Sequence, residues 1–436
     1  MLRKRMLLIS GIVGPVTGSN QSFRNTVIGY LNSDWQIVHL CFFSRKNRRY
    51  QLEDLLGFKN YRFRGIPLIL EKLAVLVKTI SKIGLKKQRK ENFQLDASHQ
   101  TFRRERFLNE VRSLNLIFFI VYSLFETVRG ILIAAFFKPD IVYAYEVYSV
   151  IPALFISKLF RIPFVKRFQG VYAAHEYELK SYRYFPFKIA YSVASDLAII
   201  TNDGTGGNKL LTQLGFPRNR IIFLLNGIDE RVLSFECKNV LRDDVLKRHS
   251  LPTDSKILTT FNRAYPAKRV DRAVYLLKSL RDKGIPVFLI WAGANGPLEE
   301  QIIEYSKMLN VHNFLRYLGP IPYEEVLKLL CISDLNLILN DEANLGNQIL
   351  EAAWLGVPTL ATDDGTNSRI IATPNIVYVK PEEFEIQGPI KAIEILEKNI
   401  SERHVRPTTL YSWKRRMEVE IKLIEKLLSR GRARMK

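Results

Sequence analysis

Residues 333–369 read SDLNLILNDEANLGNQILEAAWLGVPTLATDDGTNSR, and the spacing of apolar residues in this stretch predicts a fold. Residues 335–339 are a short apolar run typical of a buried strand, residues 347–355 predict a helix, and residues 357–361 predict a second strand. Residues 340–345 form the loop before the helix. This order makes a βαβ unit whose loop lies at the carboxyl edge of a parallel sheet, where open α/β sheets bind ligands.

The predicted helix has recognisable ends and one unusual residue. Asn344 is the candidate N-cap, Gly356 stops the helix and Pro358 comes after the stop. Glu351 is flanked by apolar residues on both sides. A carboxylate in so apolar a helix needs a partner or a ligand, because burying an unpaired charge is costly. The alternative, that Glu351 lies on a solvated edge of the helix, stays open at this point.

The segment GNQILEAAWLGVPTLATDDG, residues 346–365, resembles the donor-binding segment of the family 4 glycosyltransferases of GT-B fold. In that family a glycine-containing loop enters a helix that carries a Glu, and a Gly-x-Pro strand comes next. The family pattern is Glu, seven residues, Glu. Glu351 matches the second Glu, which in the family binds the nucleotide ribose.

The first Glu of the family pattern is replaced in this chain. Its position is occupied by Ala343, with Glu342 one residue earlier and Asn344 one residue later. Some family members carry an Asn-Leu-Gly-Asn type of loop instead, which residues 344–347 resemble. The resemblance therefore implies that Glu342, Asn344, Gly346 and Asn347 belong to the donor-binding loop.

Arg263 and Lys268 stand five positions apart around a predicted turn that contains Pro266. An arginine offers a planar fork for phosphate and a lysine offers a point charge. In the family such an Arg-x4-Lys pair grips the donor diphosphate and stabilises it as the leaving group. Gly293 lies in a glycine loop behind the next predicted strand. We favour a donor site over two solvated cations, because this loop and the Glu351 segment lie in the same half of the chain.

The second half of the chain alternates strands and helices, which predicts a parallel sheet. With a similar alternation in the first half, the expected fold class is α/β, and the resemblance implies a GT-B architecture of two Rossmann-like domains facing a cleft. We expect an acceptor-binding domain over residues 1–230 and a nucleotide-sugar-binding domain over residues 231–412. Residues 413–436 predict a terminal helix, which in the family crosses back to the first domain.

The first half contributes further candidate site residues. Gly14 lies in a glycine loop between the first predicted strand and a helix, an arrangement that suits an anion. The family strand that ends in His-Gly ends here in Gln169 and Gly170, and His175 lies beyond the motif. A lone histidine is more often a surface or core residue than a catalyst. Glu146, Gln169 and His175 are the candidates on the acceptor side.

Composition fits a globular chain of two domains. The chain has 436 residues, of which 47% are hydrophobic, and a formal net charge of +22. Residues 45–106 hold 17 Lys or Arg and 6 Asp or Glu, a net charge of +11. This segment is expected to be irregular apart from an amphipathic helix over residues 68–83. Such charge suits an anionic partner or a well-solvated face, and the helix suits a membrane surface or an ordinary core.

Three cysteines have no metal-binding spacing. Cys41 and Cys331 lie in apolar runs, so we expect buried thiols in a reducing compartment. Residues 1–13 imitate a signal peptide, but they lack a cleavage site and predict a first buried strand. No membrane-spanning length is expected, because residues 114–125 are too short and Glu126 and Arg129 interrupt the sequence after them.

The resemblance implies a retaining glycosyltransferase that takes its sugar from a nucleoside-diphosphate sugar of UDP or GDP type. No acidic motif in the sequence suits a metal–diphosphate, so we expect no metal and no cofactor. The expected acceptor is a lipid-linked or polysaccharide intermediate in cell-surface glycan biosynthesis, at the inner face of an anionic membrane, with no nucleic acid as partner. A sugar-nucleotide epimerase of the same fold, or a non-catalytic binder of polyanions, remains the alternative.

Overall fold

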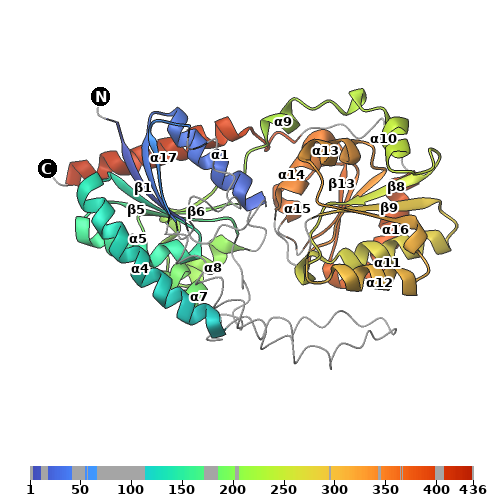
Figure 1. The fold of residues 1–436 in the computed structure, drawn as a ribbon, viewed down its shortest axis with the longest axis horizontal. Helices are drawn as coiled ribbons and strands as arrows, with labels where there is room; N and C mark the ends of the chain where they lie inside the picture. The colour runs from blue at the N-terminus through green and yellow to red at the C-terminus, as the bar shows by residue number, and fades with distance from the viewer. Residues whose placement is uncertain are drawn as a thin grey trace. The chain divides into compact units, whose positions relative to one another are not determined.

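The computed structural model describes residues 3–10, 18–41, 55, 57–65, 113–170, 185–201, 206–293, 296–341, 345–363, 365, 367–397 and 407–434. The chain divides into two compact units (Figure 1). Unit 1 comprises Met1–Thr201, Gly206–Asn226 and Lys414–Lys436, and unit 2 comprises Asn202–Thr205 and Gly227–Trp413. Each unit is built on one parallel sheet, which confirms the predicted α/β class with two Rossmann-like sheets.

The sheet of unit 1 has seven parallel strands in the order β3-β2-β1-β4-β5-β6-β7. The strands are β1 Arg5–Ser10, β2 Gln36–Cys41, β3 Tyr61–Arg64, β4 Ile141–Tyr145, β5 Phe164–Phe168, β6 Leu197–Ile200 and β7 Ile221–Phe223. The central strands are buried on both faces, which explains why β1, β4 and β6 are mostly apolar in sequence. Strand β5 is also buried but carries Lys166 and Arg167. The strand order reverses between β1 and β4, so the loops behind these two strands flank a topological switch point.

Helices cover both faces of this sheet (Figure 1). The helices of unit 1 are α1 Gly18–Asn32, α4 Ser113–Phe137, α5 Val150–Phe160, α7 Phe185–Ser192, α8 Gly207–Gln213 and most of α17 Trp413–Arg434. Residues of α4, α5, α7 and α8 share one apolar core with the sheet, and residues of α1 and α17 share the other. Successive residues of β1 alternate between the two cores, as the period of a strand requires.

Helix α17 is tied to the sheet of unit 1 by a buried charge network. Glu420 accepts hydrogen bonds from the hydroxyls of Tyr30 at 2.9 Å and Tyr143 at 2.8 Å. Arg416 pairs with the same carboxylate from within the helix, and Arg167 of β5 lies 3.8 Å from it. Burial alone would raise the pKa of Glu420, but the guanidinium groups of Arg416 and Arg167 and the Tyr143 hydroxyl hold it below its ordinary value. The carboxylate is therefore ionised in the core and fixes the position of α17.

The sheet of unit 2 has six parallel strands in the order β10-β9-β8-β11-β12-β13. The strands are β8 Lys256–Thr260, β9 Val287–Ala292, β10 Leu315–Gly319, β11 Leu335–Ile338, β12 Thr359–Thr362 and β13 Ile376–Val379. The helices are α9 Glu230–Leu233, α10 Arg242–Arg248, α11 Val270–Asp282, α12 Glu299–Met308, α13 Tyr323–Cys331, α14 Asn347–Leu355, α15 Asn367–Ile370 and α16 Phe384–Glu397. The order reverses between β8 and β11, which places a second switch point there.

The βαβ unit predicted from residues 333–369 is confirmed, with one change at the helix start. Strand β11, helix α14 and strand β12 succeed each other as expected. Gly356 adopts a left-handed conformation with φ 72° and ends the helix. The N-cap is Gly346, in extended conformation, so the expected role of Asn344 as N-cap is wrong.

Two expectations about the apolar and basic segments also need correction. Strand β3, Tyr61–Arg64, lies in the basic segment expected to be irregular, and the helix expected over residues 68–83 lies outside the described residues. Within α4, Phe119–Phe137 is long and apolar enough to cross a membrane by length and composition. Glu126 and Arg129 do not interrupt this span, because Glu126 is buried and the two residues form an ion pair.

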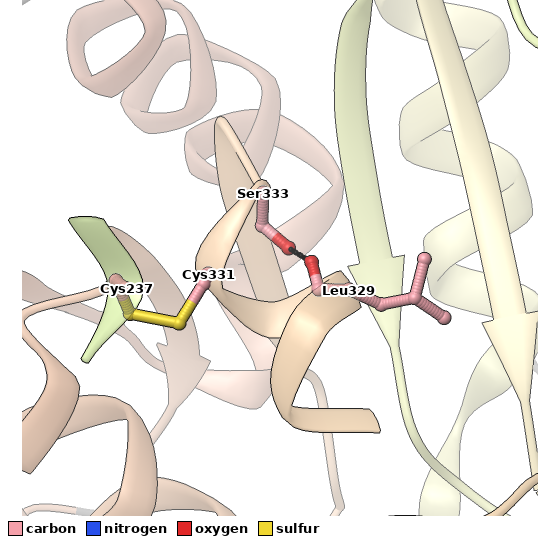
Figure 2. The surroundings of a disulfide bond; sticks show 4 residues. All are labelled: Cys237, Leu329, Cys331 and Ser333. Carbon is pink, nitrogen blue, oxygen red and sulfur yellow. Dashed lines mark hydrogen bonds between the residues drawn. A yellow bond between two sulfur atoms is a disulfide. The ribbon is translucent and has the colours of Figure 1, made fainter. Parts of the chain in front are cut away.

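Cys237 and Cys331 form a disulfide, so the expectation of a free thiol at position 331 is wrong (Figure 2). Cys331 is the last residue of α13, and 94 positions separate the two cysteines. Behind it, the Ser333 hydroxyl donates to the Leu329 carbonyl at 2.8 Å. The disulfide ties the segment between α9 and α10 to α13. Cys41 is a buried thiol, as predicted.

Candidate functional site

The loop behind β8 carries the predicted diphosphate-binding residues. Arg263 is exposed, and its guanidinium lies 4.9 Å from the centroid of the Tyr265 ring. The short 3₁₀ turn Pro266–Lys268 comes next, and Lys268 is half-buried. Arg263 and Lys268 therefore share one loop at the carboxyl edge of the sheet, on the side of the switch point.

The backbone of this loop is fixed by the glycine loop behind β9. A Cβ on Gly293 would lie 2.3 Å from the Asn262 carbonyl oxygen, and one on Gly296 would lie 2.3 Å from the Ala264 carbonyl oxygen. Trp291 Nε1 donates to the same Asn262 oxygen at 2.8 Å. Only glycine permits so close an approach of two backbones. Gly293 and Gly296 thus determine the path of the backbone on either side of Arg263.

The loop behind β11 is attached to the same turn through Asp341. Its backbone N–H donates to the Ala267 carbonyl at 3.1 Å. Its carboxylate lies 2.8 Å from Nη1 of Arg269 and 3.0 Å from Nη2 of Arg272. Sequence reasoning did not single out Asp341. The two loops at the switch point are therefore held together by a carboxylate between two arginines.

Helix α14 begins directly behind these loops. Gly346 caps the helix, Asn347 is its first residue, and the Gln348 side-chain amide donates to the Phe261 carbonyl at the end of β8. The first N–H groups of a helix and its positive dipole end favour an anion. The start of α14 is thereby joined to the loop that carries Arg263.

Glu351 is buried, which excludes the solvated alternative. Only 6% of the residue is exposed, and its Oε1 accepts a hydrogen bond from the Tyr323 hydroxyl at 2.6 Å. Burial raises the pKa of Glu351 to about 7; the Tyr323 bond and the Arg231 charge lower it, and Asp229 raises it further. The carboxyl group therefore titrates near neutral pH.

Three residues around Glu351 were not predicted as site residues. Arg231 makes two hydrogen bonds to Asp229, at 2.9 and 3.0 Å, and its guanidinium lies 4.3 Å from the centroid of the Tyr323 ring. Asp229 also caps α9 by accepting from the Arg231 N–H at 3.0 Å. The short motif Asn-Gly-Ile-Asp, residues 226–229, is the sequence signal that could have drawn attention to Asp229. The result is a partly buried cluster of two acids, one arginine and one tyrosine.

Unit 1 brings two of the acceptor-side candidates together beside its own switch point, behind the neighbouring strands β4 and β5. Glu146 comes directly after β4, and its Oε1 accepts from the Gln169 backbone N–H, behind β5, at 2.8 Å. Burial of the carboxyl group raises the pKa of Glu146 to about 7, against the effect of that bond and of Arg167. Glu146 has φ 69° and ψ 169°, a combination that is costly for any residue with a side chain.

The remaining candidates, Gly14, His175, Glu342 and Asn344, lie outside the described residues. Within the described part of the chain, no group of three or more His, Cys, Asp or Glu is placed to hold a metal ion. The described candidates thus form a donor-side set in unit 2 and an acceptor-side pair in unit 1.

Residues 242–406 match the family model described as Glycosyl transferases group 1. This matching segment contains Arg263, Lys268, Gly293 and Glu351.

Several curated relatives match part of the chain, among them the following two. N-acetyl-alpha-D-glucosaminyl L-malate synthase of Bacillus anthracis is 28% identical over 163 residues, which cover 37% of this chain and 41% of the relative. The GPI3 subunit of phosphatidylinositol N-acetylglucosaminyltransferase from Saccharomyces cerevisiae strain YJM789 is 24% identical over 245 residues, which cover 50% and 52%. The chain thus spans about half the length of these relatives, or less.

Among solved structures, that of Anabaena Alr3699/HepE in complex with UDP and glucose superimposes with a TM-score of 0.66. The sequences are 13% identical, and the match covers 98% of this chain and 100% of the other. At this identity the likeness shows the fold alone, and that fold is GT-B.

Proposed function

We propose that this chain is a retaining glycosyltransferase that moves a sugar from a nucleoside-diphosphate sugar to a lipid-linked or polysaccharide acceptor. The observation that carries the proposal is the convergence of three elements on the switch point of unit 2. These are the loop with Arg263 and Lys268, the start of α14, and the buried Glu351 on that helix. They lie inside the segment that matches the glycosyl transferases group 1 model.

The donor diphosphate is assigned to Arg263, Lys268 and the first N–H groups of α14. Departure of the nucleoside diphosphate develops negative charge on the phosphate oxygens. Fixed cations and N–H groups stabilise that charge as the bond breaks, and they do so without reorganisation at the moment of reaction. Gly293 supports this role indirectly, because it holds the backbone beside Arg263.

The nucleotide ribose is assigned to Glu351. Its Oε1 already accepts from Tyr323, so Oε2 is the oxygen that we assign to a ribose hydroxyl. A hydroxyl donor stabilises the ionised carboxylate and lowers its pKa, which burial has raised. Tyr323 of α13 and Arg231 of α9 are positioning residues: they hold the Glu351 carboxylate in place.

The acceptor is assigned to the edge of unit 1 where Glu146 and Gln169 meet. A carboxyl group whose pKa is near 7 suits a hydroxyl nucleophile, because it can accept the proton that the acceptor loses. The strained backbone of Glu146 supports a functional role, since such conformations cluster at active sites. We also propose that the chain acts in cell-surface glycan synthesis at the inner face of a membrane. Both curated relatives are named for reactions of N-acetylglucosaminyl groups.

A ligand panel tests the donor site first. UDP, GDP, ADP and their sugars are added to the purified chain, and the melting temperature is measured, because a ligand that binds only the folded chain raises it. We expect one nucleotide family to stabilise the wild type and to lose this effect in Lys268→Ala. No stabilisation by any nucleotide would contradict the proposal and would favour a non-catalytic binder.

Product analysis then distinguishes transfer from epimerisation. The donor that binds is incubated with and without a lipid-linked or glycan acceptor, in the presence and absence of EDTA. Acceptor-dependent release of the nucleotide that persists in EDTA is the expected result. Conversion of the sugar nucleotide without acceptor would identify an epimerase instead.

A further inference from the structure

The outer face of α4 is an exposed apolar stripe. We use the name α4 outer face for its six large exposed residues, which are Ile120, Val121, Leu124, Val128, Leu132 and Phe136. Five of them, from 120 to 136, repeat at intervals of four positions, so each contacts the next and together they form a stripe about 24 Å long, at 1.5 Å per residue, that winds slowly around the helix. Leu124 is 67% exposed and Phe136 is 88% exposed. Such an apolar stripe on a monomer marks an interaction surface.

The opposite side of α4 belongs to the core of unit 1, so the helix cannot leave the unit to cross a membrane. Ala134 is buried in the core that α4 shares with α5. The Tyr122 hydroxyl donates to the Ser10 carbonyl at the end of β1 at 3.2 Å. Arg129 pairs with Glu126 and donates to the carbonyls of Arg64 at 2.8 Å and Gly65 at 2.9 Å. Only the outer face is therefore offered to a partner.

Among the described residues on and directly after α4, α5 and α7, the exposed charged side chains are all cationic. Exposed cations stand just behind α4 and on or beside the neighbouring helices α5 and α7; they are Lys138, Lys158, Arg161 and Lys188. The described residues of α4, α5 and α7 include no exposed Asp or Glu. The exposed end of α5 adds Phe155 and Leu159 to the apolar surface. Figure 1 shows α4, α5 and α7 on the same side of the sheet of unit 1.

We propose that the α4 outer face seats in the interfacial region of an anionic bilayer, with α4 parallel to the membrane plane. A protein partner would be recognised through hydrogen bonds, at about one per 100–200 Å² of interface. The exposed residues of α4 between positions 120 and 136 have no polar side-chain atom to supply them. A bilayer needs only apolar area flanked by cations, which this surface presents.

This inference goes beyond the transfer reaction and rests on the exposure of α4 alone. It differs from membrane binding by the basic segment 45–106, most of which lies outside the described residues. If both proposals hold, the bilayer would keep the acceptor-side edge of unit 1 near lipid-linked substrates. Because the donor site lies in unit 2, vesicle binding and nucleotide binding can each fail without the other.

Co-flotation of the full chain with vesicles tests the proposal. Vesicles of phosphatidylcholine alone are compared with vesicles that also contain phosphatidylglycerol, at low and high salt. The test variant combines Leu124→Asp with Leu132→Asp. Matched controls are Leu241→Asp and Ile386→Asp in unit 2, whose side chains are 68% and 72% exposed. Melting temperatures with and without the nucleotide verify that every variant is folded and keeps its donor site.

We expect the wild type and both controls to float with the anionic vesicles and the double variant to lose at least tenfold in partitioning. Absence of flotation in the wild type would overturn the proposal. Equal flotation of the double variant would also overturn it and would assign the binding to other residues, such as the basic segment. A dimer in vesicle-free solution that the double variant abolishes would overturn it in favour of a second copy of the chain on this face.

Discussion

Replacing Glu351 by glutamine should change how the stability of the chain depends on pH. Burial raises the pKa of this carboxyl from 4.5 to about 7 in the folded chain. Between these values the folded chain binds more protons than the unfolded chain, so the free energy of unfolding falls as pH rises through this window. The difference between the two pKa values corresponds to about 3 kcal/mol in the free energy of unfolding, at 1.36 kcal/mol per pKa unit. The contribution is fully lost above about pH 7.

Glu351→Gln has no proton to lose at this position. Its free energy of unfolding relative to the wild type should therefore rise by about 3 kcal/mol between about pH 5 and pH 8.5. Denaturant unfolding of both proteins across this range measures the difference. Glu126 and Glu146, whose pKa values are also raised to about 7, are present in both proteins and cancel. Glu385→Gln, at an exposed position of α16, serves as the matched control and should show a constant difference.

Parallel curves for the wild type and Glu351→Gln would refute the reasoning, because the carboxyl would then not be held in a dry environment. Ionisation of Glu351 should also affect nucleotide binding. Ribose hydroxyls donate to the ionised carboxylate, so affinity for a nucleotide sugar should rise as pH passes through about 7 and then level off. The glutamine variant should lose this pH dependence.

Three further predictions concern other parts of unit 2. Lys268→Ala should lower kcat by roughly 30- to 1,000-fold, on the order of 2–4 kcal/mol, whereas Glu351→Gln should mainly raise KM. Steady-state kinetics distinguishes the two effects, with Lys283→Ala as the control. Gly293→Ala should destabilise the chain by about 1–3 kcal/mol and weaken nucleotide binding, since its Cβ would meet the Asn262 carbonyl at 2.3 Å; an unchanged melting temperature would contradict this. Reducing the disulfide should cost about 4.7 kcal/mol by the chain-entropy relation for a 94-residue loop, measured by unfolding with and without reductant, and Cys237→Ser should not respond to reductant.

The fold was predictable because its signals are local. Strands β11 and β12 are short apolar runs, and Gly356 and Pro358 mark the end of the helix between them. Strand β3 was missed because Tyr61–Arg64 alternates aromatic and basic residues at the edge of the sheet, inside a segment rich in charge. At the edge of a sheet, one face of a strand contacts solvent, so polar residues alternate with apolar ones and the strand has no continuous apolar run.

The site was predictable only in part, because its remaining features depend on residues far apart in the sequence. Glu351 accepts a hydrogen bond from Tyr323, 28 positions away, and no pattern links the two. Asp341 becomes important only because the chain brings Arg269 and Arg272 beside it. Such distant pairings become visible only when the sheet order is known.

The position of α17 has a consequence for the order of synthesis. Its residues Met417, Ile421, Ile424 and Leu428 complete one of the two cores of unit 1, yet the whole of Gly227–Trp413 is translated first. At about 5–20 residues per second, this delay lasts roughly 10 to 40 s. During that time the nascent sheet of unit 1 lacks the cover of α17 on one apolar face. By the time α17 is synthesised, almost all of unit 2 has been translated. The second unit in the sequence can therefore be the first to finish folding, and the first unit waits for the last helix of the chain.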